Sequence, residues 1–284
     1  MRRVALPPHV VEFSADDDLA APALAALYPA APESAAPPTF RYRLERGRDG
    51  DWTARAHRQP PFGPAALGDA WAFLEWRAIE DVLHEPGPDA VYVHAAGVRI
   101  GGRLVLLVGG PGSGKSTLTA LLLRRGHPIL GDDVLRFDAC EGCFGAVPRS
   151  IKLDPLTLRE LGLGGMADRG PEGGTFLAAG AAYTSPAVFL AGWEAGRGPA
   201  WGVVLLGGPP HTGPALLARR GEGGAAVRLL QGVLGNPRAG AASGPGRADA
   251  RLRLLESLEG ARAWEAGGAD PARLADLIVE AVRT

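Results

Sequence analysis

Eight consecutive residues at positions 109–116 have types and spacing suited to binding phosphate groups. They read Gly-Gly-Pro-Gly-Ser-Gly-Lys-Ser, follow an apolar run and fit the pattern GxxxxGK[ST]. Glycines let the backbone curl so that N–H groups cradle phosphates, and the following helix adds the positive end of its dipole. The lysine would reach the terminal phosphates and the last serine would bind magnesium. We therefore expect a nucleoside triphosphate site formed by Gly109, Gly110, Pro111, Gly112, Ser113, Gly114, Lys115, Ser116 and Thr117.

Two adjacent acids, Asp132 and Asp133, follow a short buried strand predicted at 127–130. Carboxylates at a strand end beside a phosphate loop can hold a magnesium complex or activate a hydroxyl nucleophile. Because neighbouring side chains on a strand diverge, one acid can face the metal while the other faces the acceptor. The alternative is an acidic turn that leads into the hairpin predicted at 134–137 and 144–147.

The basic residues include 28 arginines and only two lysines, Lys115 and Lys152. Lys152 follows the predicted hairpin, on a strand expected to return toward the loop, where its ammonium could neutralise phosphate charge. A surface lysine is the alternative. His94 lies on an apolar strand predicted at 91–95, where a buried core histidine is the alternative to a catalytic role.

These spacings resemble the kinase domain of HPr serine kinase/phosphorylase and HPr-kinase-related proteins. The resemblance covers roughly residues 90–155 and rests on His94 lying 21 residues before Lys115, on Arg125-Gly126-His127, and on the Asp pair 17 and 18 residues after Lys115. More loosely, the flanks resemble the HPr-kinase-related group found beside peptide-modification genes. The segments that carry this looser similarity are Leu74-Glu75-Trp76 and 148–153.

The resemblance implies that His94 and Lys115 belong to an active site, that Asp133 is the base for an acceptor serine, and that Ser116 binds magnesium with Asp132. Relatives in that family assemble into hexamers, so a homo-oligomer is implied as well. The chain departs from the pattern in two places. It has no clear counterpart of the family's Gly-Arg-Asn segment, and Glu160 is the only candidate for a further magnesium-binding Glu.

The elements that must position these residues can be read from local patterns. Apolar residues at helical spacing predict an amphipathic helix at 67–83, and the Gly101-Gly102 turn predicts a hairpin that ends at the phosphate loop. Later in the chain we expect a strand at 201–206, a helix near 225–234, and a final helix that begins with Asp270 as N-cap and Pro271. The run 161–174 lacks periodicity and is interpreted as a loop over the site or a linker.

We therefore predict an α/β protein: a P-loop kinase core of HPr-kinase type, with a mixed sheet and flanking helices, and a small N-terminal α+β region. The expected domains are 1–86 and 87–284. Gly and Pro number 41 and 25, which favours many turns. The net charge of -1 provides no global field that would recruit nucleic acid or a membrane.

Two long uncharged stretches, 173–193 and 199–218, have the length of a membrane span, but their Pro and Gly residues favour short buried strands. The N-terminus lacks a signal-peptide pattern, so a cytoplasmic location is expected. Cys140 and Cys143 form one CxxC, interpreted as a hairpin turn rather than a metal or redox site.

The predicted function is transfer of the terminal phosphoryl group of ATP, with Mg2+, to a hydroxyl, most plausibly a serine of a protein or a ribosomally made peptide. The residues expected to act in catalysis are Asp133, His94, Lys115 and Lys152. A nucleotide-binding regulatory or peptide-binding module, a small-molecule hydroxyl kinase and a transporter-type ATPase are the alternatives. The missing LSGGQ-like signature argues against the ATPase.

Overall fold

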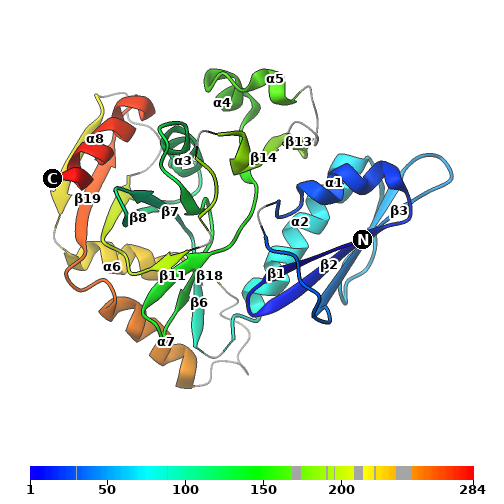
Figure 1. The fold of residues 1–284 in the computed structure, drawn as a ribbon, viewed down its shortest axis with the longest axis horizontal. Helices are drawn as coiled ribbons and strands as arrows, with labels where there is room; N and C mark the ends of the chain where they lie inside the picture. Colours follow the sequence, from blue (N-terminus) through cyan, green and yellow to red (C-terminus); the bar gives the residue numbers. More distant parts are fainter. Residues whose placement is uncertain are drawn as a thin grey trace. The chain divides into compact units, whose positions relative to one another are not determined.

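A computed structural model divides the chain into two compact units (Figure 1). It describes residues 1–29, 31–87, 89–167, 174–189, 191–194, 196–207, 214–220, 222–234 and 245–284. Unit 1 comprises Met1–Glu85 and Pro148–Val188, and unit 2 comprises Pro86–Val147 and Phe189–Thr284. The sequence predicted a boundary at 86, with everything after it in one domain. In the structure the chain enters unit 2 near that point, but residues 148–188 return to unit 1.

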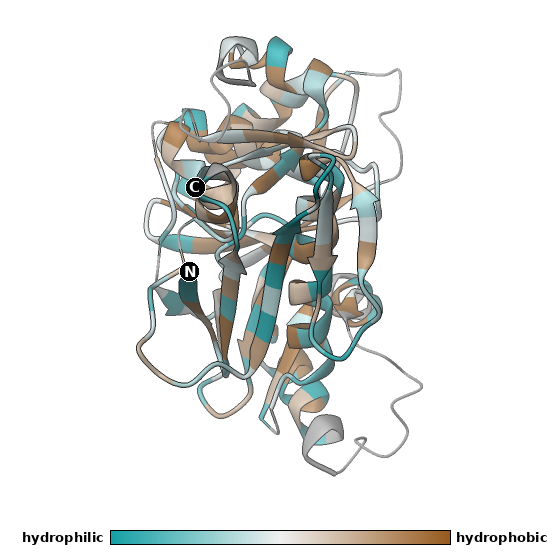
Figure 2. Ribbon diagram, turned by 90° about the vertical axis from the view of Figure 1, so that its right-hand side faces the viewer, coloured by the Kyte–Doolittle hydropathy of each residue, from teal (hydrophilic) through white to brown (hydrophobic). Residues whose placement is uncertain are grey.

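Unit 1 contains a five-stranded sheet with strand order β1-β2-β3-β4-β5, in which only β2 and β3 are parallel neighbours. Its strands are β1 Arg2–Leu6, β2 His9–Ala15, β3 Phe40–Arg46, β4 Trp52–Arg55 and β5 Phe62–Ala65. Buried and exposed residues alternate along β3, because successive side chains of a strand point to opposite faces. Figure 2 shows such alternation as brown and teal bands along strands. The sheet therefore buries one face.

The helices of unit 1 pack on this sheet and on a second, three-stranded one. The elements are η1 Asp18–Ala20, α1 Ala21–Ala26, α2 Leu67–His84, α4 Pro155–Glu160, α5 Gly164–Ala167 and η3 Pro186–Val188, with β12 Ile151–Leu153, β13 Thr175–Ala178 and β14 Ala181–Thr184. The second sheet has the order β12-β14-β13. The fully buried Trp71 of α2 packs against Phe176 and Tyr183 of this sheet, at centroid distances of 4.7 and 4.6 Å. The returning segment is thus part of the core of unit 1.

An ion pair joins the two stretches of chain that form unit 1. The carboxylate Oε1 of Glu75 on α2 lies 2.7 Å from Nη2 and 2.9 Å from Nε of Arg149. The exposed fractions of the two side chains are only 7% and 16%. Both residues lie in the segments that carry the looser family similarity, and the guanidinium of Arg149 is held by this carboxylate.

Replacement of Glu75 by Ala is expected to destabilise unit 1 by about 3 kcal/mol, since removing one partner of a buried pair leaves the other charge without compensation. Chemical denaturation followed by tryptophan fluorescence would measure this loss. The matched control is Glu45→Ala, which breaks an exposed pair with Arg55 and should cost less than about 1 kcal/mol. Equal losses in both variants would show that the Glu75–Arg149 pair contributes nothing beyond a surface contact.

Unit 2 contains a six-stranded sheet with the order β17-β19-β16-β8-β7-β9. The strands are β7 Ala95–Ile100, β8 Arg103–Val108, β9 Ile129–Gly131, β16 Gly202–Leu206, β17 Leu216–Arg220 and β19 Arg262–Gly267. β8, β16 and β19 are parallel, and β7 is antiparallel to both of its neighbours, β8 and β9. Therefore β8 and β9 run in the same direction, and their carboxyl ends lie at the same edge of the sheet.

A second, antiparallel sheet of unit 2 has the order β15-β11-β10-β6-β18. Its strands are β6 Ala90–Val93, β10 Leu135–Asp138, β11 Cys143–Ala146, β15 Arg197–Gly198 and β18 Val233–Leu234. The helices are α3 Lys115–Arg124, α6 Glu222–Gln231, α7 Pro245–Glu256 and α8 Pro271–Arg283. α3 packs against α8 and β7, whereas α6 packs against β16, β19 and α7 (Figure 1). One buried core joins both sheets of unit 2 to α6 and α7. It includes Leu106 of β8, Phe137 of β10, Leu229 of α6 and Leu254 of α7.

Most elements expected from sequence are present. The Gly101-Gly102 turn connects β7 and β8, and Asp270 caps α8 by accepting hydrogen bonds from the backbone N–H of Ala272 and Arg273 at 2.9 and 3.0 Å. The helix expected near 225–234 ends at Gln231, because 233–234 pair with β6 instead. Cys140 lies in the turn between β10 and β11, as predicted. Within 161–174, residues 164–167 form α5, and 168–173 lie outside the described residues.

No helix within the described ranges is long and apolar enough to cross a membrane. The stretch 199–218, which has the length of a span, contains the buried strand β16 and the start of β17, and 208–213 lie outside the described residues.

Candidate functional site

Three segments of the predicted site meet at one edge of the six-stranded sheet of unit 2. Val108, the last residue of β8, pairs with Ala95, the first of β7, so His94 lies next to the start of the phosphate loop. Gly131, the last residue of β9, pairs with Gly97 two residues further along β7. The Asp pair that follows Gly131 therefore emerges at this edge too. The antiparallel strand β7 thus connects all three segments.

The loop at 109–114 links β8 directly to α3, in the order that the motif predicts. Gly112 and Gly114 have φ values of +74° and +86°, in the left-handed region that favours glycine. A Cβ on Gly110, Gly112 or Gly114 would meet no atom within 4 Å, so the loop leaves open space on that side. At Gly109 a Cβ would overlap the Ser113 side chain. Glycine is therefore required at 109 for packing and at 112 and 114 for the turn.

Lys115, the first residue of α3, turns back over this loop. Its Nζ donates hydrogen bonds to the carbonyl oxygens of Gly109 and Gly110, at 2.7 and 3.3 Å, and the residue is only 6% exposed. Burial lowers the pKa of the Lys115 ammonium below its usual value, while the carboxylates of Asp133 and Asp132 oppose that shift. Both acids thus lie within electrostatic reach of the lysine, which joins the cation and the acids in one site.

The two acids differ in exposure. Asp132 is buried, 4% exposed, whereas the Asp133 side chain is 46% exposed. Gly131 allows the turn before them, because a Cβ there would lie 2.6 Å from the carbonyl oxygen of Val134. The structure therefore separates the pair, with one carboxylate inside the protein and the other open to an incoming molecule.

His94 contacts the exposed acid. Its ring Nε2 lies 2.6 Å from Oδ1 of Asp133. The backbone holds His94 in place, because its N–H donates to the carbonyl oxygen of Gly232 at 2.7 Å, just before β18 pairs with β6. His94 is therefore not a histidine of the apolar core, which was the alternative. Its ring contacts the exposed carboxylate of Asp133.

A cavity of about 250 Å³ lies beside the loop. Its walls include His94, the first three residues of the loop, and Arg228 with Gln231 from α6. Its other lining residues are Val108, Leu205, Leu206 and Gly232. Sequence reasoning missed Arg228 and Gln231, because one arginine among 28 carries no signal and α6 is about a hundred residues from the motif.

Two predicted residues do not lie in this unit. Lys152 is on β12 of unit 1, where its strand pairs with β14 rather than with the sheet that carries the loop, and its Nζ lies 5.7 Å from the ring centroid of Tyr183. Glu160 ends α4, also in unit 1. The roles assigned to Lys152 and Glu160 stay predictions.

The residues around the loop fit Mg2+ bound together with a nucleotide. Magnesium prefers oxygen ligands and is usually held by one or two carboxylates plus phosphate oxygens. Ser116, the second residue of α3, supplies a hydroxyl directly after the loop, and the buried Asp132 supplies a carboxylate at the same edge of the sheet. Among the described residues no cluster of three or more His, Cys, Asp or Glu could hold a metal ion.

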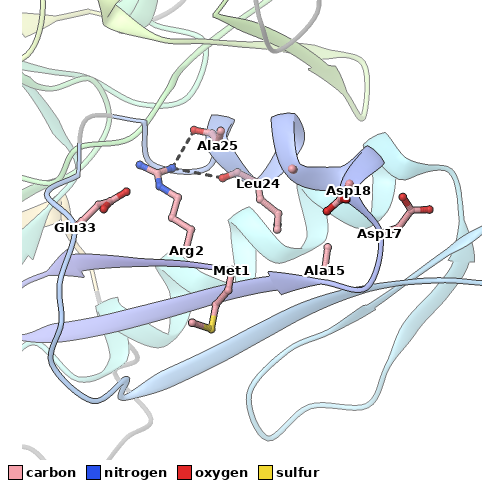
Figure 3. A pocket seen from close by; sticks show the side chains of 9 residues that line it. Met1, Arg2, Ala15, Asp17, Asp18, Leu24, Ala25 and Glu33 are labelled. Atoms are coloured by element: carbon pink, nitrogen blue, oxygen red, sulfur yellow. Dashed lines mark hydrogen bonds between the residues drawn. The ribbon is translucent and has the colours of Figure 1, made fainter.

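A second cavity, of about 280 Å³, lies within unit 1 (Figure 3). Asp17, Asp18 and Glu33 line it, and these carboxylates would repel a triphosphate. Arg2 also lines it, but its guanidinium donates to the carbonyl oxygens at the end of α1, including Ala25 at 2.9 Å. This cavity is therefore not a phosphate site.

Comparisons with known proteins show limited similarity. No protein-family model matches the chain, and no curated protein sequence matches it. Among solved structures, the HPr(Ser) kinase/phosphatase from Coxiella burnetii matches with 16% sequence identity over 68% of this chain and 93% of that chain, with a TM-score of 0.33. Because this similarity is low in both sequence and shape, the chemistry is inferred from the residues of the site itself.

Proposed function

We propose that the protein is an ATP- and magnesium-dependent kinase that transfers the terminal phosphoryl group to a hydroxyl, in particular a serine of a protein or peptide. The observation that carries this proposal is the contact of 2.6 Å between His94 Nε2 and Asp133 Oδ1, next to a glycine loop with a buried lysine. A loop that only binds nucleotide needs no oriented, solvent-accessible carboxylate. A kinase needs one to take the proton of its acceptor.

Each group has one role in the proposed transfer. The loop N–H groups and Lys115 bind the phosphates, and Asp133 accepts the proton of the acceptor hydroxyl. The acceptor oxygen then bonds to the terminal phosphorus as the bond from that phosphorus to the bridging oxygen breaks, and the bond electrons leave with ADP. Magnesium, held by Ser116 and Asp132, would neutralise charge on the phosphates.

The 46% exposure of the Asp133 side chain favours an acceptor carried by a large molecule. A serine on a peptide reaches an open carboxylate without being enclosed, whereas a free small hydroxyl compound is usually surrounded by its site. The proposed cellular setting is the cytoplasm, where ATP and Mg2+ are available.

The first test is incubation of the full chain with ATP, Mg2+ and a pool of serine-containing peptides, followed by mass spectrometry. We expect one peptide or more to gain one phosphoryl mass, with an equal amount of ADP formed, and we expect chelation of the metal to abolish the gain. ATP binding without transfer to any peptide or to free serine would favour the regulatory module instead.

Replacement of His94 by Ala is expected to lower kcat about 10-fold to 100-fold with little change in KM for ATP, because the Asp133 carboxylate loses its orientation. His94→Gln places an amide near the position of Nε2 and should recover part of the loss. The pH profile of kcat distinguishes orientation of Asp133 by the imidazole from proton transfer by the imidazole. If His94 only orients Asp133, the Gln variant keeps the acidic limb of the wild-type profile. Equal rates for Ala and Gln variants would show that His94 does more than position Asp133.

A further inference from the structure

The cavity beside the phosphate loop is lined by polar and apolar residues. Gly109, Gly110 and Pro111 of the loop contribute to the lining together with His94. Arg228 and Gln231 form the part contributed by α6, the α6 wall, and Val108, Leu205 and Leu206 are apolar. A charged group that enters the cavity can therefore meet the loop backbone and the polar side chains of His94, Arg228 and Gln231.

Helical spacing explains how α6 presents this wall. Arg228 and Gln231 are three residues apart and lie on one face of the helix. Leu229, on a different face, is 0% exposed and belongs to the core shared with β8 and α7. Because Leu229 anchors α6, the position of Arg228 at the cavity is set by core packing.

Arg228 is available to bind an anion. Its side chain is exposed, and among the described side chains no carboxylate forms an ion pair with it. Arg228 supplies a guanidinium to the lining of the cavity. Lys115 is not one of the lining residues, and its ammonium donates to the carbonyl oxygens of Gly109 and Gly110. A guanidinium presents a planar fork of donors that matches two phosphate oxygens.

We propose that Arg228 binds the phosphoryl group that is transferred, from the α6 wall of the cavity, and stabilises the charge on its oxygens in the transition state. The proposal rests on the proposed function. The nucleotide remains bound through the loop and Lys115, so Arg228 contributes to transfer rather than to the affinity for ADP. Gln231, one turn further along α6, would donate a hydrogen bond to the same group.

Binding experiments test this role without an identified acceptor. The variants are Arg228→Ala and Arg228→Lys, and the control is Arg251→Ala, which removes an exposed arginine of α7 that does not line the cavity. Calorimetry would give the affinity of each protein for Mg·ADP alone and for Mg·ADP with aluminium fluoride, which stands in for the phosphoryl group in transit.

We expect the control to gain affinity on adding aluminium fluoride as the wild type does. Arg228→Ala should bind ADP within about 3-fold of wild type but lose about 10²-fold of that gain, since only transition-state contacts are removed. Lysine should recover little, because it lacks the fork. An unchanged gain in Arg228→Ala would overturn the proposal, and so would an equal loss of ADP affinity, which would make Arg228 a nucleotide-binding residue.

The same experiments separate this proposal from the proposed function. If the wild type phosphorylates no acceptor but still gains affinity with aluminium fluoride through Arg228, the kinase assignment fails while the role of Arg228 toward a transferred phosphoryl group stands. If peptide phosphorylation is found and Arg228→Ala retains the full kcat, the kinase assignment stands and the role of Arg228 is refuted.

Discussion

Asp133→Asn is expected to abolish phosphoryl transfer while leaving the binding of ATP nearly intact. The amide has the same shape and still reaches His94, but it cannot take a proton from the acceptor hydroxyl. Loss of a general base lowers the rate by about 10²-fold to 10⁴-fold, and we expect about 10³-fold. The affinity for Mg·ATP should stay within about 3-fold, because the loop and Lys115 provide the phosphate contacts.

Two further variants sharpen this experiment. Asp133→Glu keeps a carboxylate displaced by one methylene group and should be faster than Asp133→Asn, though slower than wild type. Asp249→Asn removes one exposed negative charge of α7 and controls for the change in net charge. Phosphorylated peptide, quantified by mass spectrometry under single-turnover conditions, is the measurement. Transfer at the wild-type rate in Asp133→Asn would remove its role as base.

The local parts of the site could be predicted from the sequence because each depends on a few neighbouring residues. Glycines at 112 and 114, with positive φ, give the loop, and the Gly101-Gly102 turn aligns the strand that ends at it. The Asp pair at 132–133 could be placed at a strand end because an apolar run precedes it. Its contact with His94, at 2.6 Å, agrees with the spacing that suggested one site.

The parts that sequence missed depend on contacts between distant segments. Unit 1 includes 148–188 because Trp71 packs on Phe176 and Tyr183 and because Glu75 binds Arg149. A single sequence does not identify such partners, so the predicted boundary at 86 left this return of the chain out. Arg228 was missed for the same reason, since its position follows from the packing of Leu229 into a core that is assembled from several elements.

Lys115→Ala and Lys115→Met are expected to weaken the binding of ATP and to stop transfer without unfolding unit 2. The Lys115 ammonium donates hydrogen bonds to the carbonyl oxygens of Gly109 and Gly110, which holds it at the loop where phosphate oxygens would bind. Its removal takes away a charge that acts on both ground state and transition state. We expect about 10-fold to 100-fold weaker binding of Mg·ATP and a further loss of about 10²-fold in kcat.

The methionine variant distinguishes this effect from misfolding. Burial lowers the pKa of Lys115, which means that the folded protein disfavours the charged amine, so an apolar side chain of similar length removes that cost. Lys115→Met should therefore melt at the wild-type temperature or above it while binding little ATP. Arg253→Ala, an exposed cation on α7, is the matched control for charge and should leave both quantities unchanged. A Lys115→Met protein that binds Mg·ATP like wild type would show that the glycine loop is a structural turn and not a phosphate site.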